Sequence, residues 1–110
     1  MSKLIHVDSA KGRWQTLSLA EQMGNIGSEI NRALKFQEKN KERFENAINR
    51  ALDLFDLTIE DPRWSHRLKE ITRVREVFCN TVFSDNEYNT SLDDLNQYFY
   101  LFALAARKNE

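Results

Sequence analysis

The sequence predicts an all-α fold: an antiparallel four-helix bundle with up-down-up-down topology and a short irregular N-terminal arm. Three observations support this prediction. The chain has 110 residues, which suits one domain with one core. It contains only 3 Gly and 1 Pro, too few for the frequent turns of a β-sandwich or barrel. Its apolar residues recur at the three-to-four spacing of amphipathic helices in separate segments of the chain.

The first segments are an arm and a capped helix. Residues 1–15 show no helical period and form the predicted arm, whereas residues 16–110 form the predicted bundle domain. The first predicted helix spans about 18–39, because Ser18 and Glu21 have the spacing of a capping box. In such a box each side chain accepts a hydrogen bond from the backbone N–H of the other residue.

Three further helices are predicted from their end signals. The second spans about 41–60 and the third about 62–83. Asp61 and Pro62 mark the boundary, since Asp is a good N-cap acceptor and Pro is tolerated at the first helical position. The fourth helix spans about 91–107, again after a cap-like signal. The connections between these helices are short, which favours antiparallel neighbours.

Small side chains lie along one flank of the first predicted helix, at Ala20, Gly24, Gly27 and Asn31. Each glycine costs a helix about 1 kcal/mol relative to alanine, so a packing reason is expected. A second helix can approach closely where side chains are missing. The spacing therefore predicts a close helix crossing on this flank.

Arg75 falls in the middle of the apolar stripe of the third predicted helix. A buried and unpaired charge costs several kcal/mol, so we expect an acidic partner from another helix. The candidate partners are Asp53, Asp56 and Glu29. The favoured interpretation is a structural ion pair, or a long side chain whose charged head reaches water past its own stem. The alternative is an anion or partner site. A further alternative is a small enzyme with an internal site around Arg75, which needs Arg75 to have no acidic partner from the protein.

Residues 98–106 of the fourth predicted helix are apolar or aromatic on every side, which one core-facing stripe does not explain. The second predicted helix also carries apolar residues away from its main stripe. The residues left to be covered by the arm, another helix or a second subunit are Tyr100, Leu101, Leu104, Leu54 and Leu57. They predict a homo-oligomer that forms through the second and fourth helices.

Polar residues on the first and third predicted helices form a candidate surface for a protein partner. Its members are Glu21, Asn25, Glu29, Arg32, Arg67 and Arg73. We therefore expect a non-catalytic helical module for self-assembly or protein interaction. The alternative is a nucleic-acid-binding accessory protein that uses the basic residues of the third helix, Arg63, Arg67, Lys69 and Arg73. Nucleic acid is not the favoured partner, because acidic residues interrupt this basic set.

The composition gives no sign of a cofactor or a membrane segment. With 16 basic and 17 acidic residues the net charge is -1, so nothing attracts nucleic acid or anionic lipid globally. Only His6 and His66 are present, Cys79 is the single cysteine, and no P-loop, dinucleotide or nucleophile-elbow motif occurs. There is no apolar leader and no long apolar run. We expect a cytoplasmic protein without metal, cofactor or catalytic residues.

Overall fold

The computed structural model describes residues 11–83 and 90–108. All regular structure in these residues is helical, which confirms the all-α prediction. The helices that lie entirely within the described residues are α2 (Leu19–Phe36), α3 (Lys41–Ile59), the 3-10 helix η1 (Pro62–Arg67), α4 (Leu68–Phe83) and α5 (Leu92–Lys108). The predicted spans 18–39, 41–60 and 91–107 match α2, α3 and α5 to within one turn at each end.

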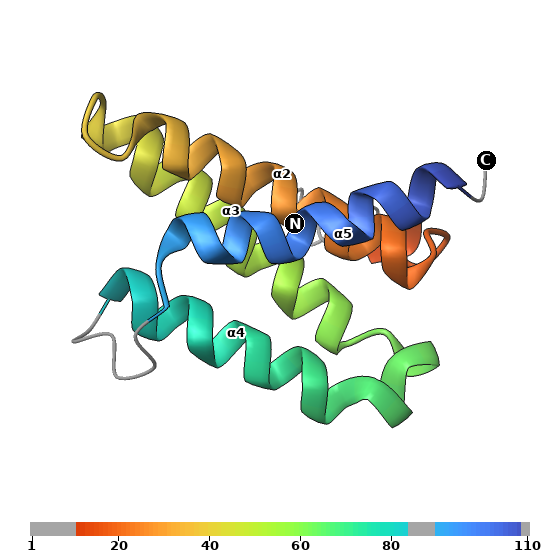
Figure 1. Ribbon diagram of the computed structural model, residues 1–110. Coiled ribbons are helices and arrows are strands. Elements are labelled where there is room, and N and C mark those ends of the chain that lie inside the picture. The colour runs from red at the N-terminus through yellow and green to blue at the C-terminus, as the bar shows by residue number, and fades with distance from the viewer. Residues whose placement is uncertain (1–10, 84–89, 109–110) are drawn as a thin grey trace.

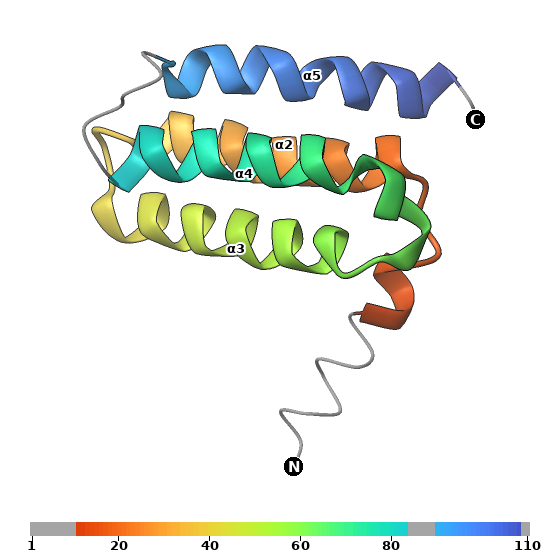
Figure 2. The same ribbon diagram turned by 90° about the horizontal axis from the view of Figure 1, so that it is seen from below.

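The four long helices pack against one another in a regular order. Successive helices run in opposite directions (Figure 1). α2 contacts α3 and α5, and α4 contacts the same two helices. Figure 2 shows α5 and α3 on opposite sides of the molecule, with α4 in front of α2. α2 and α4 therefore lie diagonally across from each other, with α3 and α5 between them.

Three of the four long helices begin at side-chain caps, because the first backbone N–H groups of a helix have no partner inside it. At α2, Glu21 N donates to Ser18 Oγ at 3.1 Å and Ser18 N donates to Glu21 Oε1 at 3.0 Å, which confirms the predicted capping box. At α5, Ser91 and Asp94 form the equivalent pair at 3.0 and 3.1 Å. At α3, Arg43 N donates to the side chain of Asn40 at 3.0 Å.

The third predicted helix begins at Pro62 with Asp61 as its N-cap, as expected, but its first turns are not α-helical. The chain forms a 3-10 helix from Pro62 to Arg67, and the α-helix α4 begins only at Leu68. Within η1, Trp64 has φ −103° and ψ 18°, which are not α-helical values. The physical reason is tertiary: the indole N–H of Trp64 donates to Gln22 Oε1 of α2 at 2.9 Å, and this contact holds the bend against the start of α2.

The predicted arm also contains a helical turn in its described part. Residues 11–14 are helical, and Gln15 N donates to Lys11 O at 3.0 Å. Residues 1–10 of the arm lie outside the described residues. Trp14 ends the turn and is buried, with its indole N–H donating to Thr58 Oγ1 of α3 at 2.9 Å. Burial of this large ring attaches the turn to the rest of the protein.

The core is formed by the apolar stripes of all four long helices together with Trp14. Phe55 of α3 lies at its centre, with its ring centroid 5.6 Å from that of Phe78 of α4 and 5.9 Å from that of Phe99 of α5. These distances are typical of tilted and edge-to-face aromatic pairs. α4 contributes only Ile71 and Phe78 as buried residues. The Phe55–Phe78 contact therefore joins the buried face of α4 to α3.

α2 and α5 approach closely at the two glycines of α2. A Cβ atom at Gly24 would lie 3.4 Å from Ala103 Cα, and one at Gly27 would lie 2.6 Å from Phe99 Cβ. The second distance leaves no room for a side chain, so the backbone of α2 sits directly on Phe99. The close helix crossing predicted on this flank is confirmed, and α5 is the helix that makes it.

Candidate functional site

The outer face of α5 carries the largest group of exposed apolar side chains in the described part of the chain. Tyr100 is 54% exposed, Leu101 63% and Leu104 40%. The opposite face of α5 is buried through Leu92, Leu95 and Phe99. The helix is thus apolar on both its inner and outer faces, as the sequence pattern indicates. Nothing in the described residues covers the outer face.

Opposite charges flank this apolar face at the two ends of α5. Exposed Asp93 and Asp94 lie in the first turn, and exposed Arg107 and Lys108 lie in the last turn. Both pairs complement the helix dipole, which is positive at the N-terminus and negative at the C-terminus. The backbone N–H of Ser91 donates to the Asp94 carboxylate and, together with the Ser91 hydroxyl, lowers the pKa of Asp94, so this carboxylate stays ionised at neutral pH. From the N-terminus to the C-terminus of α5, the outer face is therefore first acidic, then apolar and finally basic.

An open groove of about 920 Å³ borders the apolar face between α5 and α2. Gly24 and Gly27 form part of its wall on α2, and Tyr100 and Leu101 form part of its wall on α5. Of the two glycines, Gly24 is partly exposed to the groove, whereas Gly27 is buried against Phe99. The groove enlarges the surface that a partner of α5 could contact.

Leu54 and Leu57, which the sequence placed on the self-association surface, are positioned differently by the structure. Both are partly buried and pack against the hydrophobic core. Thr58, next to Leu57, is fully buried and donates to Leu54 O at 2.9 Å. This part of α3 is covered by the chain itself, because the Trp14 turn packs beside it. The uncovered apolar surface is therefore on α5.

The polar residues expected to bind a protein partner do not form one surface. Glu21 and Asn25 are exposed on α2, with the Asn25 amide donating to Glu21 O at 2.9 Å. Arg73 of α4 lies across the molecule from them, because α2 and α4 are diagonal (Figures 1 and 2), whereas Arg67 belongs to η1, which packs against the start of α2 through Trp64. Arg67 also donates to Glu70 at 2.9 Å, which engages its charge locally.

Glu29 is buried, whereas the sequence placed it beside the solvent face of α2. The residue is 7% exposed and lies between α2 and α3. Its carboxylate oxygens are 3.8 Å from Arg32 NH1 and 3.8 Å from Arg50 Nε. The rotation of α2 about its axis turns Glu29 toward α3, and a helical spacing alone does not fix that rotation. Arg32 remains exposed, on the α3 side of α2.

Arg75 is half-buried and paired, not fully buried. Its Nε lies 3.0 Å from Asp56 Oδ1 of α3, and the two side chains are 34% and 56% exposed. Of the three candidate partners, Asp56 makes this contact, while Glu29 pairs with arginines of α2 and α3. The small-enzyme alternative needed Arg75 without an acidic partner. Because Asp56 pairs with Arg75, this requirement is not met.

A buried polar network at the η1 end of the molecule was not anticipated from the sequence. Gln22 of α2 is fully buried, and its amide N–H₂ donates to Trp14 O at 2.8 Å and to Asp61 Oδ2 at 3.0 Å. Its carbonyl oxygen accepts from the Trp64 indole. The network ties the Trp14 turn, the start of α2 and the α3–η1 connection together. Its sequence signal, a Gln within the apolar stripe of a helix, is weak by itself.

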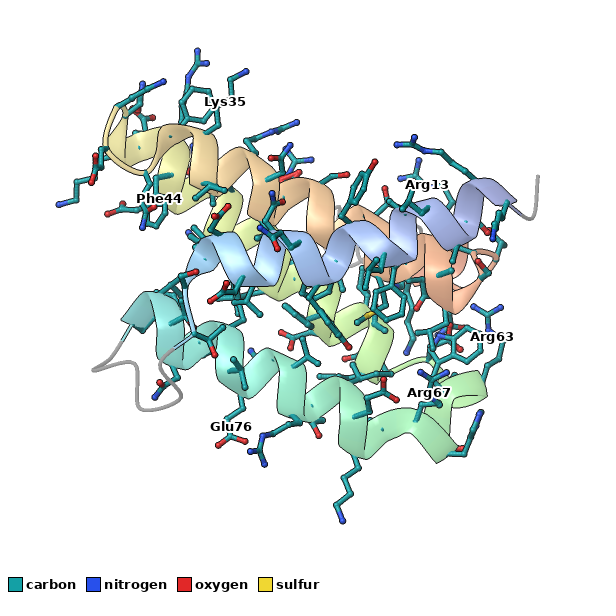
Figure 3. All side chains as sticks on the ribbon, viewed as in Figure 1. Arg13, Lys35, Phe44, Arg63, Arg67 and Glu76 are labelled. Carbon is teal, nitrogen blue, oxygen red and sulfur yellow. The ribbon has the colours of Figure 1, made fainter. Side chains whose placement is uncertain are left out.

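Asp61 is the charged centre of this network. The Arg63 guanidinium donates to both of its carboxylate oxygens, at 2.7 to 3.2 Å, and this lowers the pKa of Asp61 to about 2. Arg63 NH2 also donates to Leu17 O at 2.6 Å. Figure 3 shows Arg63 and Arg67 at the η1 end of the protein. The Arg63 side chain therefore stabilises the fold. The N–H donors that it directs to Asp61 and Leu17 are not free to bind nucleic acid, as the alternative interpretation of the basic residues required.

Among the described residues, no three or more His, Cys, Asp or Glu side chains are grouped so that they could hold a metal ion. None of the described helices combines the length and apolar character that a bilayer span requires. No protein-family model matches the chain, and no curated protein or solved structure matches it either. The functional proposal therefore rests on the surfaces described above.

Proposed function

We propose that this chain is a non-catalytic helical self-assembly module in which α5 of one copy lies antiparallel to α5 of a second copy. The observation that carries the proposal is the exposed apolar face of Tyr100, Leu101 and Leu104, flanked by acids at one end and bases at the other. A fold of four antiparallel helices in a bundle, located in the cytoplasm, is part of the same proposal. The short connections and the single free thiol of Cys79 support it.

The spacing on α5 suits an antiparallel helix pair. Five of its exposed residues follow alternating steps of four and three, the spacing of one seam of a coiled coil. These seam residues are Asp93, Gln97, Tyr100, Leu104 and Arg107. Each lies on the outer face of α5, so a second helix can contact all of them along one line.

The charges specify the register. A two-fold axis between Tyr100 and Leu101 places Tyr100 of one copy against Leu101 of the other copy, and the reverse. The same axis places Asp94 against Arg107 of the second copy, and Asp93 against its Lys108. An interface between identical copies needs such reciprocal pairs, and a parallel pair of helices would instead place like charges together. The charge pattern therefore favours a second copy over an unrelated partner.

The expected dimer is weak. α5 has 17 residues and is about 25 Å long, so one helix pair covers less than the roughly 800 Å² per partner of a standard interface. We expect a dissociation constant of about 10 to 1,000 μM, an affinity of roughly 4 to 7 kcal/mol.

Light scattering over a protein concentration series tests the proposal. We expect the average mass of the wild type to rise from monomer toward dimer, and Leu101→Lys/Leu104→Lys to stay a folded monomer. The matched control is Leu68→Lys/Phe83→Lys, which places the same charges on the exposed apolar residues of α4. The control should dimerise like the wild type. A wild type that stays monomeric to millimolar concentration, or a control that loses the dimer while the α5 variant keeps it, contradicts the proposal.

A further inference from the structure

A second groove lies on the other side of α2, between α2 and α3. It has a volume of about 520 Å³, and basic side chains from both helices line it. The basic residues are Arg32 and Lys35 of α2 and Arg43 and Arg50 of α3. No acidic residue is among the side chains that line it. In a protein with a net charge of -1, this is a local concentration of positive charge.

The helical hairpin creates this groove. Arg32 and Lys35 are one turn apart on α2, and Arg43 and Arg50 are two turns apart on α3, so each pair faces the same side of its helix. The turn between the helices brings Lys35 and Arg43 to the same ring: their charged groups lie 5.8 and 5.3 Å from the centroid of Phe36. Figure 3 shows Lys35 at the end of the molecule opposite Arg63.

A buried carboxylate lies beside the groove. The Glu29 side chain is 10% exposed and lies 3.8 Å from both Arg32 and Arg50, whose side chains are 53% and 68% exposed. These separations are too long for hydrogen bonds, and Glu29 Oε2 has no hydrogen-bond partner among the described residues. Glu29 thus attracts the two guanidinium groups without occupying their N–H donors. The donors stay available to a ligand.

We infer that this groove binds the phosphate backbone of a single strand of nucleic acid. Three guanidinium groups line it, and a guanidinium presents paired N–H donors that match phosphate oxygens. Arg43 and Arg50 are about 10 Å apart along α3, so they contact successive parts of one strand. Asn31 and Asn46 also line the groove and supply amides that hydrogen-bond base edges.

Fluorescence anisotropy of the full chain with a labelled 15-mer of oligothymidylate or oligouridylate tests the inference at several salt concentrations. We expect binding whose affinity falls with salt, with a log–log slope of about −3 for four phosphate contacts on a single strand. Arg43→Ala/Arg50→Ala should weaken binding roughly tenfold or more and reduce the slope by about 1.4. Lys11→Ala/Arg13→Ala removes the same charge from the N-terminal turn, outside the groove, and should bind like the wild type.

A second variant separates loss of binding from loss of folding. Arg50 neighbours buried Glu29, whereas Lys35 and Arg43 contact the ring of Phe36, so Lys35→Ala/Arg43→Ala leaves the Glu29 pairs intact. It should weaken binding in the same way. The inference is overturned if neither oligonucleotide binds at low salt, or if the Lys11/Arg13 variant loses as much affinity as the groove variants. It is also overturned if labelled polyglutamate binds as tightly with the same salt slope, because the groove would then select acidic chains in general.

Discussion

Gly27 of α2 lies against Phe99 of α5 so closely that a Cβ atom at Gly27 would come within 2.6 Å of Phe99 Cβ. Phe99 is itself 1% exposed and packs edge-on against Phe55 at 5.9 Å. It therefore has no free space into which it can move. The absence of one side chain on α2 sets the distance between two helices and the position of an aromatic ring at the centre of the core.

Alanine at Gly27 should destabilise the protein. The added methyl group overlaps Phe99 and forces the helices apart, which costs about 1–3 kcal/mol despite the better helix propensity of alanine. Gly24→Ala is the matched control, because its methyl group meets Ala103 at an ordinary contact distance of 3.4 Å. The control should be neutral or more stable by up to about 1 kcal/mol. Urea denaturation measures both, and equal stability of the two variants would contradict the close approach.

Asp61→Asn should make stability less dependent on acid pH. The pKa of Asp61 is lowered to about 2 in the folded protein, below its value in the unfolded chain. The ionised carboxylate therefore stabilises the fold fully above pH 4, and this contribution is lost as the pH falls toward 2. It amounts to roughly 2 kcal/mol. We expect the difference in unfolding free energy between wild type and variant to shrink by that amount between pH 5 and pH 2. A difference that is constant over this range would contradict the role of Asp61.

Arg75 and Asp56 should contribute little to stability, because both side chains are partly in water. A double-mutant cycle with Arg75→Ala and Asp56→Ala should give a coupling energy below about 1 kcal/mol, the range of solvent-exposed ion pairs. Thermal or chemical denaturation of the four proteins provides the measurement. A coupling of 3 kcal/mol or more, typical of a broken buried pair, would show that Arg75 is more buried than the structure indicates.

Exchanging charges at the ends of α5 should test the proposed antiparallel register. Asp93→Lys and Lys108→Asp each place like charges together in the dimer, so each should weaken association several-fold at low salt. The combined variant Asp93→Lys/Lys108→Asp restores opposite pairs and should recover the wild-type dimer. Sedimentation equilibrium at low and high salt reports the dissociation constants. If the combined variant is as weak as the two single changes, the register is wrong even where a dimer forms.

Local interactions made much of this fold predictable. The capping boxes of Ser18 with Glu21 and Ser91 with Asp94 involve residues within one turn, so their spacing in the sequence already specifies them. The apolar stripes depend only on the helical period. The missing side chains at Gly24 and Gly27 signal a close neighbour for the same reason. The sequence by itself thus determined the helices, their approximate ends, the closely packed flank of α2 and the apolar excess on α5.

The tertiary structure decided what each helix face meets. Gln22 and Asp61 are 39 residues apart and share a buried hydrogen bond, and Glu29 lies among arginines of two helices. The bend at Trp64, the cover over Leu54 and the basic groove of Arg32, Lys35, Arg43 and Arg50 arise in the same way. Each depends on how far a helix is rotated about its axis and where it crosses its neighbour. Many distant contacts set those quantities jointly, whereas the period of a single helix leaves them free.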